Sequence, residues 1–438
     1  MCLVQGVRLY YEGGYVESFK LKEKEVKWLI PNKGVAGQSV ENLFRKALSA
    51  PLRSPPLSKE RVERAAIIIP DHTRPPSPFL PLLLESLEKL TRDVVVVVAG
   101  GTHPPPTLSQ LQKSTGNLLE QGWSRFRHSW AKAHPSKFKL IGYTLRGTPV
   151  EVNKELLDVD LIVSTLCVRP HYFAGWEGGA KAILPGCCSL ASIRRNHSYA
   201  VGNPMARELL IDGNPVREDM NEAGKMLGDK IKYRSLDFVI DPEGRLIEAF
   251  YGEPCQTHRA AATRSREVYV VESEPASLVL TVAEGPLGRT LFQALKAYHH
   301  ACNVAYMGKS KAKVILIASL KEGIGNEEFT KEYLRYVGVE PGEVLRDLKR
   351  RMEAGEFNEV FQKIARMAMD SRHTELSVVA PEAPAEVEAF LHKAEIEFAR
   401  NLDEILEQRK EKTVIVPYGA STVPISPGSS TNTFSRST

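Results

Sequence analysis

One pattern recurs along the chain and constrains its fold more than any other feature. It is a short apolar run rich in β-branched residues, then a loop rich in Gly, Pro, His or Thr, then a segment with helical periodicity. Such runs occupy residues 65–69, 94–99 and 161–167. They are almost entirely apolar, which is expected of strands covered by helices on both faces of a sheet. The pattern therefore predicts an α/β fold with parallel strands.

The same order of segments begins again in the second half of the chain. Apolar runs at 277–282, 314–320 and 376–379 alternate with helical patterns, and a final strand is expected at 413–417. Between them, residues 384–410 carry apolar side chains at helical spacing and predict one long helix.

These segments predict two α/β domains, each with a sheet flanked by helices. We expect an N-terminal domain over residues 1–270 and a C-terminal domain over 271–424. Residues 425–438 are rich in Ser and Thr and lack an apolar pattern, so a disordered tail is expected there.

Composition excludes several classes of protein. A net charge of +5, with 42% hydrophobic and 25% charged residues, is typical of a globular protein without a dedicated nucleic-acid surface. The apolar runs are far shorter than the roughly 20 residues of a membrane helix. The N-terminus lacks a signal-peptide pattern, and six cysteines are too few for a disulfide framework. We expect a cytoplasmic protein that binds neither nucleic acid nor membranes.

Polar residues gather directly after three of the predicted strands, where open α/β sheets bind ligands. Asp71 and Arg74 follow the first run, His103 the second and His171 the third. The Arg74 guanidinium suits two oxygens of a carboxylate or phosphate, although an ion pair with Asp71 that closes the turn is an equal alternative. His103 has the side chain best suited to move a proton near pH 7, or it is a structural residue.

The segment 169–186 is the densest in such residues. Gly175, Gly178 and Gly179 could cradle a phosphate, but the spacing from Gly175 to Lys181 does not fit the P-loop pattern GxxxxGK[ST]. A nucleoside triphosphatase is therefore disfavoured. Lys181 among glycines and apolar residues is a candidate nucleophile or covalent attachment point, or else it caps a turn in solvent.

Two further candidate sites are suggested, one by a single histidine and one by a pair of residues on a predicted helix. His197 is a candidate metal ligand, but without HExxH or paired Cys/His spacing a structural role is favoured on the residue alone. Gln293 and Lys296 are three residues apart on a predicted helix and share a face, which would point at a polar ligand or simply at solvent.

Five motifs thus occur in order: Asp71-His72-Thr73-Arg74-Pro75; Gly101-Thr102-His103; His171-Tyr172-Phe173-Ala174-Gly175 with Gly178-Gly179 and Lys181; His197 with Gly202-Asn203; and Gln293 with Lys296. In this order and spacing they resemble the nickel-pincer lactate racemase family, from about residue 5 to 424. The resemblance implies two α/β domains with the active site in the cleft between them.

The resemblance also implies an activity and a cofactor. The activity is a racemase or epimerase of lactate or a related 2-hydroxy acid, by proton-coupled hydride transfer through a 2-oxo acid. The cofactor is the nickel-pincer nucleotide, a pyridinium-3-thioamide-5-thiocarboxylic acid mononucleotide that holds Ni and is bound covalently. The implied partners are the small 2-hydroxy acid and, transiently, the enzymes that make the cofactor, and a homo-oligomer is compatible with the family.

Each role is carried over to a matching residue. Lys181 would be the covalent attachment site, His197 the nickel ligand, and His103 and His171 the two acid/base residues. Arg74 and Lys296 would bind the substrate carboxylate, Gln293 would orient it, and Asp71 would hold a neighbouring His or Arg. The other implied cofactor contacts are Thr73, Gly175, Gly178 and Gly179.

The chain departs from the family pattern at three positions. Glu177 and Ala180 stand where the family usually has Ser and Arg, and Phe292 stands where it usually has Tyr. A lost hydroxyl at 292 and an added carboxylate at 177 suggest a 2-hydroxy acid other than lactate.

Two other functions stay open at this point. One is a zinc-dependent hydrolase with His103, His171 and His197 as ligands. The other is a non-catalytic module that binds a carboxylate or phosphate between Arg74 and Lys296.

Overall fold

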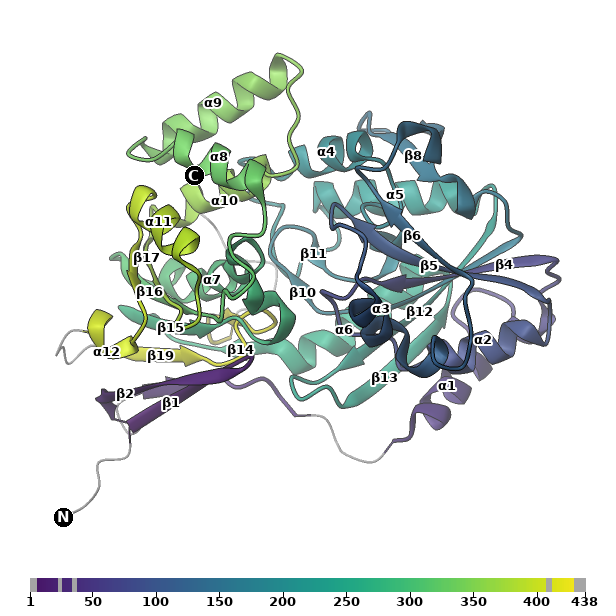
Figure 1. The fold of residues 1–438 in the computed structure, drawn as a ribbon, viewed down its shortest axis with the longest axis horizontal. Helices are drawn as coiled ribbons and strands as arrows, with labels where there is room; N and C mark the ends of the chain where they lie inside the picture. The colour runs from purple at the N-terminus through teal and green to yellow at the C-terminus, as the bar shows by residue number, and fades with distance from the viewer. Residues whose placement is uncertain (1–5, 23–25, 34–37, 407–411, 429–438) are drawn as a thin grey trace. The chain divides into compact units, whose positions relative to one another are not determined.

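The computed structural model describes residues 6–22, 26–33, 38–406 and 412–428 (Figure 1). The chain divides into two compact units. The central unit, from the middle of the sequence, comprises Asn32–Ala200 and Met205–Val268. The terminal unit comprises the described residues before Asn32, Val201–Pro204, and those from Tyr269 onward.

The central unit is built on a six-stranded sheet. Its strands are β4 (Arg64–Pro70), β5 (Asp93–Gly101), β6 (Phe126–Trp130), β9 (Leu161–Cys167), β12 (Lys232–Ile240) and β13 (Leu246–Gly252). They lie in the order β13-β12-β9-β4-β5-β6, and all pairs are parallel except β12 with β13. The three runs predicted in this half are therefore neighbours, with β4 between β9 and β5.

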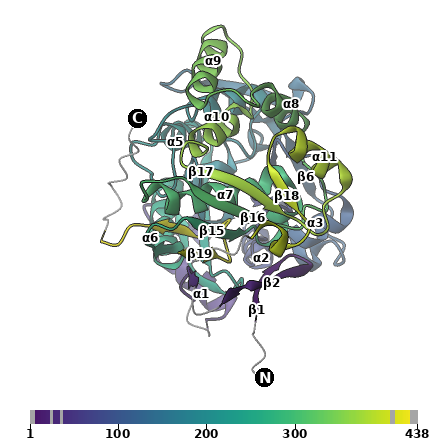
Figure 2. The same ribbon diagram turned by 90° about the vertical axis from the view of Figure 1, so that its left-hand side faces the viewer.

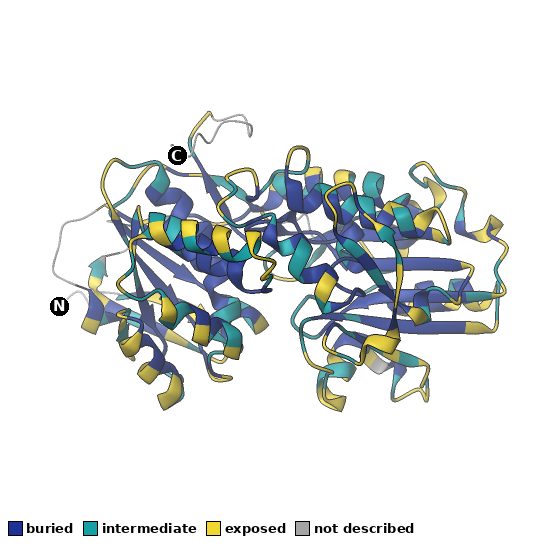
Figure 3. Ribbon diagram, turned by 90° about the horizontal axis from the view of Figure 1, so that it is seen from above, coloured by how far each residue is buried: buried dark blue, intermediate teal, exposed yellow. Residues whose placement is uncertain are grey.

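Both faces of this sheet are buried, as the continuous apolar runs predicted (Figure 3). Along β4, Ala66 and Ile68 belong to one core, whereas Ile67 and Ile69 belong to the other. The first core includes residues of helices α4 (Leu190–Ser198) and α5 (Pro215–Gly228), and the second includes residues of α1 (Val40–Ser49) and α2 (Leu80–Glu88). The central unit also contains helices α3 (Leu108–Thr115) and α6 (Pro254–Tyr269), the second of which ends at the boundary of the unit.

Two short antiparallel pairs supplement this sheet. Strands β7 (Phe138–Tyr143) and β8 (Pro149–Asn153) form one of them. Strands β10 (Pro170–His171) and β11 (Gly175–Trp176) form the other directly after β9, with His171 opposite Gly175. The 3₁₀ turn η6 (Gly179–Ala182) follows.

The terminal unit has a second six-stranded sheet, in which every pair is parallel (Figure 2). Its strands are β3 (Val26–Trp28), β15 (Leu278–Val282), β16 (Ala312–Ile317), β17 (Thr374–Val379), β18 (Glu397–Ala399) and β19 (Thr413–Val416), in the order β18-β17-β16-β15-β19-β3. A separate parallel pair joins β14 (Val270–Glu272) to β20 (Val423–Ile425).

The two faces of this second sheet are covered differently. One core includes residues of α7 (Leu291–Tyr306), α8 (Glu327–Arg335), α9 (Pro341–Glu353), α10 (Phe361–Asp370) and α11 (Ala385–Lys393). The other is closed by the hairpin β1 (Gly6–Tyr11) and β2 (Gly14–Lys22) with the short helix α12 (Leu402–Ile405). None of the helices among the described residues is long and apolar enough to cross a membrane.

The beginning of the chain lies in a different unit from the one expected. The sequence placed it in the N-terminal domain, whereas β3 pairs with β19 and the β1–β2 hairpin packs on the terminal sheet. The later boundary, between Val268 and Tyr269, falls close to the expected position at 270.

The long helix predicted at 384–410 is wrong. Helix α11 ends at Lys393, and Glu395 then adopts a left-handed backbone with φ of +55°. The chain continues as β18, which pairs with β17, so Phe398 belongs to a strand although its spacing matched a helix. Of the expected tail, Ile425 ends β20, and residues 429–438 lie outside the described part of the chain.

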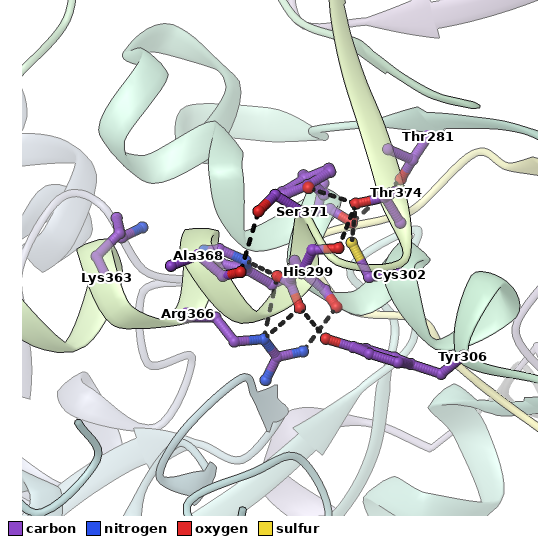
Figure 4. A network of polar contacts seen from close by, with 12 residues as sticks. Thr281, His299, Cys302, Tyr306, Lys363, Arg366, Ala368, Ser371 and Thr374 are labelled. Carbon is purple, nitrogen blue, oxygen red and sulfur yellow. Dashed lines mark hydrogen bonds and ion pairs between the residues drawn. The ribbon is translucent and has the colours of Figure 1, made fainter. Parts of the chain in front are cut away.

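A buried polar network ties α7 to α10, and Figure 4 labels its members His299, Tyr306 and Arg366. The Asp370 carboxylate accepts hydrogen bonds from Arg366 Nε at 2.9 and 3.1 Å and from His299 Nδ1 at 2.6 Å, and another from the Tyr306 hydroxyl. Burial by itself would raise the pKa of Asp370, but Arg366 and His299 outweigh it and hold the pKa at about 2. An ionised carboxylate therefore joins the two helices.

We predict that Asp370→Asn lowers the free energy of unfolding by at least about 2 kcal/mol at pH 7. The unfolded pKa is near 3.8 and the folded pKa about 2, each pKa unit corresponds to about 1.4 kcal/mol, and Arg366 would stay buried without its counter-ion. A lowered carboxyl pKa stabilises the fold above the unfolded value, and this stability is lost as the pH falls toward the folded value.

Urea unfolding followed by circular dichroism at pH 7, 4 and 3 checks this prediction. The difference from wild type should shrink below about pH 4. Glu353→Gln on α9, at an exposed position, is the control and should change stability by less than about 0.5 kcal/mol. A difference that stays constant down to pH 3 would contradict the role given to Asp370.

Candidate active site

Three loops that follow adjacent strands of the central unit meet in the structure. They follow β4, β5 and β9, and parallel strands end at the same edge of a sheet. A contact between Asp71 and His103 joins the first two loops, and a contact between Arg74 and Glu177 joins the first and third. The residues predicted at these three strand ends are therefore linked.

Asp71 organises the loop after β4. Its carbonyl accepts the Arg74 N–H at 3.1 Å, which closes a turn. Its Oδ1 accepts hydrogen bonds from the N–H and the hydroxyl of Thr73, at 3.0 and 2.6 Å. The Thr73 hydroxyl in turn accepts one from Arg74 Nη1 at 2.9 Å. The turn is therefore closed by a backbone hydrogen bond and by the hydrogen bonds of Thr73. The second oxygen of the Asp71 carboxylate, Oδ2, contacts His103.

The hydrogen bond between Asp71 and His103 has a defined direction. Burial acts to raise the pKa of Asp71, but His103 and Arg74 outweigh it and hold the pKa well below its usual range. An ionised carboxylate only accepts hydrogen bonds, so His103 must donate through Nδ1. In the neutral ring, Nε2 then carries the lone pair that can accept a proton.

His171 and His197 lie against one aromatic ring. The Phe173 centroid is 4.6 Å from that of His171 and 5.0 Å from that of His197. His171 Nδ1 accepts the Ala174 N–H at 3.3 Å, so in the neutral ring its proton is on Nε2. His197 stands in the last turn of α4, and its Nδ1 lies 3.2 Å from the side-chain oxygen of Asn196.

Three glycines between positions 175 and 181 have a backbone conformation that only glycine adopts readily. Gly175, Gly178 and Gly179 have φ values of +76°, +76° and +58°. A Cβ on Gly175 would stand 2.0 Å from the Leu210 carbonyl oxygen, and one on Gly179 would stand 2.7 Å from the His258 side chain. Lys181 follows in η6, half-buried, at the end of this loop.

A fully buried arginine that the sequence analysis missed holds this loop. Arg217 of α5 donates from Nε to the Ala174 carbonyl at 3.1 Å, from Nη1 to that of Gly178 at 3.3 Å, and from Nη2 to that of Trp176. Burial lowers its pKa to about 10, so it stays charged at neutral pH. A signal was present, because Arg217 precedes Met220 and Gly224 at helical spacing on the buried side of α5.

Two further buried groups, also missed, support the loop from α6 and β12. The Gly179 N–H donates to Asp237 Oδ1 at 3.1 Å, and burial raises the Asp237 pKa to about 6. His258 Nε2 donates to the Glu177 carbonyl at 3.0 Å, and burial lowers the His258 pKa well below its usual value. Their positions depend on pairing between distant segments, which no local pattern reveals.

Glu177, one of the three departures from the family pattern, points into this group of loops. Its carboxylate lies 3.2 Å from Arg74 Nε and 3.3 Å from Arg169 Nε, and its side chain is 5% exposed. The arginine predicted to bind a substrate carboxylate is therefore paired with a carboxylate of the protein.

The other two departures, Ala180 and Phe292, pack against residues of their own units. Ala180 is buried, and a Cβ on Gly224 would lie 2.9 Å from the Ala180 Cβ. The ring of Phe292 has the Lys363 ammonium 4.4 Å from its centroid.

Gln293 and Lys296 belong to the terminal unit, on α7. Lys296 is buried and Gln293 is half-buried, so this is not the solvated helix face of the simpler alternative. Their helix is anchored at His299 and Tyr306 by the Asp370 network.

Among the residues that the structure describes, no group of three or more His, Cys, Asp or Glu side chains could hold a metal ion. His103, His171 and His197 therefore do not form the three-ligand site that the zinc hydrolase alternative requires.

We predict that Gly175→Ala destabilises the protein more than Gly244→Ala does. Both glycines belong to the central unit with similar φ, +76° and +82°, but a Cβ on Gly244 would have nothing within 4 Å, whereas one on Gly175 meets a backbone oxygen. Gly244→Ala should cost about 1–2 kcal/mol from backbone strain, and Gly175→Ala about 1–3 kcal/mol more from overpacking. Equal losses in urea unfolding would show that the Leu210 contact carries no strain.

Known proteins resemble this chain along most of its length. Residues 11–208 match the model of the lactate racemase N-terminal domain. A lactate racemase from Thermoanaerobacterium thermosaccharolyticum is 31% identical over 326 residues, covering 71% of this chain and 74% of the relative. A lactate racemase from Lactiplantibacillus plantarum is 28% identical over 299 residues, covering 66% and 69%.

Solved structures extend the similarity to the whole fold. The lactate racemase apoprotein from Thermoanaerobacterium thermosaccharolyticum superposes with a TM-score of 0.82 at 25% identity, over 96% of this chain and 100% of the other. A Thermotoga maritima protein shares the fold alone, with a TM-score of 0.67 at 17% identity, over 90% and 100% of the two chains. The protein therefore belongs to the lactate racemase family and is an isomerase of the racemase class.

Proposed function

We propose that the protein racemises or epimerises a 2-hydroxy acid, lactate or a close relative, with a nickel-pincer nucleotide bound covalently to Lys181. The observation that carries this proposal is the Asp71–His103 pair, which stands in the same group of loops as His171 and the glycine segment that ends at Lys181. The non-catalytic alternative is disfavoured by membership of a family of isomerases.

The residues present are suited to such a cofactor. Lys181 stands at the end of the loop of Gly175, Gly178 and Gly179, which pack closely against Leu210, Val168 and His258, and its amine can form the covalent link. Thr73 and Asp71 are proposed as further contacts. The imidazole of His197 is a ligand type that nickel accepts. When bound, the cofactor would supply the acceptor and donor of the hydride.

His103 and His171 are proposed to move the proton of the substrate hydroxyl. Removing the α-proton would leave a carbanion beside a carboxylate, whereas removing the hydroxyl proton with hydride loss leaves a neutral ketone. His103 Nε2 can accept that proton, and His171 presents an N–H at Nε2 in its neutral form. Chemistry on both faces of a substrate requires one group to accept while another donates, which two such rings satisfy.

Substrate binding is assigned to Arg74, Lys296 and Gln293. The guanidinium and the ammonium would bind the carboxylate, and the amide of Gln293 would orient it. Lys296 is buried, so its charge acts in a medium of low dielectric constant, where its attraction to a carboxylate is stronger than in water.

Attachment of the cofactor is tested first, because it does not depend on the substrate. We predict that the protein co-produced with the enzymes that make the cofactor carries an adduct on Lys181 and bound nickel, by intact mass, peptide mapping and metal analysis. Lys181→Arg should abolish the adduct, and His197→Ala should lower the nickel content. Lys225→Arg, at an exposed position on α5, is the matched control and should keep both. An unmodified wild-type chain without nickel would refute the cofactor assignment.

We predict that Asp71→Asn lowers the racemisation rate by roughly 10²- to 10⁴-fold while the adduct on Lys181 survives. An amide at this position can offer an N–H to Nδ1 of His103, which moves the ring proton to Nε2 and removes the base. Loss of optical purity followed from each enantiomer measures the rate. Asp212→Asn, on the exposed pair with Arg259, should leave the rate unchanged. Full activity of Asp71→Asn in both directions would show that this carboxylate does not position the base.

A further inference from the structure

The Glu177 carboxylate forms ion pairs with two guanidinium groups from two different loops. Oε1 is 3.2 Å from Arg74 Nε, on the loop after β4, and Oε2 is 3.3 Å from Arg169 Nε, directly after β9. Each carboxylate oxygen therefore has its own cation. Glu177 and Arg169 are buried, whereas the Arg74 side chain is 24% exposed and is the accessible member.

The backbone on both sides of this carboxylate is fixed. The Glu177 N–H donates to the Arg169 carbonyl at 2.7 Å, and the Glu177 carbonyl accepts the His258 ring N–H at 3.0 Å. The next two residues, Gly178 and Gly179, are held in left-handed conformations in the loop that Arg217 supports. The carboxylate is thus a built part of the loop and not a surface side chain that happens to reach an arginine.

The pairing changes how an anion meets Arg74. Two guanidinium groups with one carboxylate leave a single net positive charge, where a neutral residue at 177 would leave two. An incoming carboxylate or phosphate also approaches a fixed like charge, which opposes binding in a partly desolvated site. The planar guanidinium of Arg74 can donate hydrogen bonds to two oxygens of one anion, and one of its donors, Nε, already faces Glu177.

We propose that Glu177 is a specificity-determining residue that acts as an internal anion and competes with ligand carboxylate or phosphate groups for Arg74. This inference rests on the proposed function for the place of Arg74 in ligand binding. A ligand anion gains its contact with Arg74 by exchange with Glu177, so affinity for anions is lower than the two arginines alone would give. The residue at 177 thereby determines how strongly this arginine binds a ligand anion.

The test measures binding to the apoprotein, without cofactor or turnover. Sodium lactate and inorganic phosphate are titrated at constant ionic strength against wild type and Glu177→Gln, and an apparent Kd is fitted to the rise of Tm with anion concentration. We expect Glu177→Gln to lower that Kd about tenfold or more for at least one of the anions, in line with a charge-assisted hydrogen bond. A gain for lactate alone assigns the Arg74 position to a carboxylate, and a gain for phosphate alone assigns it to a phosphate group.

Three further proteins separate competition from a general effect of charge or folding. Glu60→Gln removes a carboxylate that is equally buried and also paired with two cations, Arg234 at 2.8 Å and Lys232 at 3.3 Å, and should leave anion binding unchanged. Glu177→Ser provides a second neutral residue should the glutamine variant unfold. Arg74→Met combined with Glu177→Gln should lose the gain.

The outcomes are distinct from those that test the racemase. Unchanged or weaker anion binding in both neutral variants at 177, including no detectable binding, would overturn the proposal. So would a gain that persists without Arg74 or appears equally in Glu60→Gln. Failure to form the Lys181 adduct would instead refute the cofactor assignment and would leave these binding curves as they are.

Discussion

The buried guanidinium of Arg217 is the interaction on which the arrangement of the loop after β9 depends. A backbone with several left-handed residues cannot pair its carbonyls in a regular ladder, and buried carbonyls without donors are costly. Arg217 supplies three donors in one plane to the carbonyls of Ala174, Trp176 and Gly178. A lysine could not do this, because its donors radiate from a single atom. Helix α5, together with Asp237 of β12 and His258 of α6, thus determines where Glu177 and Lys181 stand.

Strand order then decides which side chains meet. Because β4 lies between β5 and β9, the loop of Asp71 and Arg74 has the His103 loop on one side and the Arg169–Glu177 segment on the other. In the terminal unit, the ionised Asp370 fixes α7 at His299 and Tyr306, two points in the C-terminal half of that helix. In both units, a buried charged residue holds an element that carries proposed site residues in one orientation. Arg217 does so for the loop after β9, and Asp370 does so for α7.

Much of the architecture could be predicted because its signals are local. Largely apolar runs mark β4, β5, β9, β15, β16, β17 and β19, and each forms within a few residues of the expected position. Two features could not be predicted. The placement of β3 beside β19 depends on pairing across nearly the whole chain. The break at Glu395 depends on β18 gaining a partner in β17, which outweighs a helical spacing that includes Phe398.

For the site, the sequence by itself determined which residue types stand at the ends of the strands: His103, His171, Lys181 and the glycines that precede Lys181. Their order along the chain was enough to identify the family. Only the tertiary structure decided that Glu177 turns toward Arg74 and Arg169, and that Arg217 lies beneath the loop. The reason is physical: a side chain's partners are set by segments far apart in sequence, whereas backbone conformation and strand formation are largely set by neighbours.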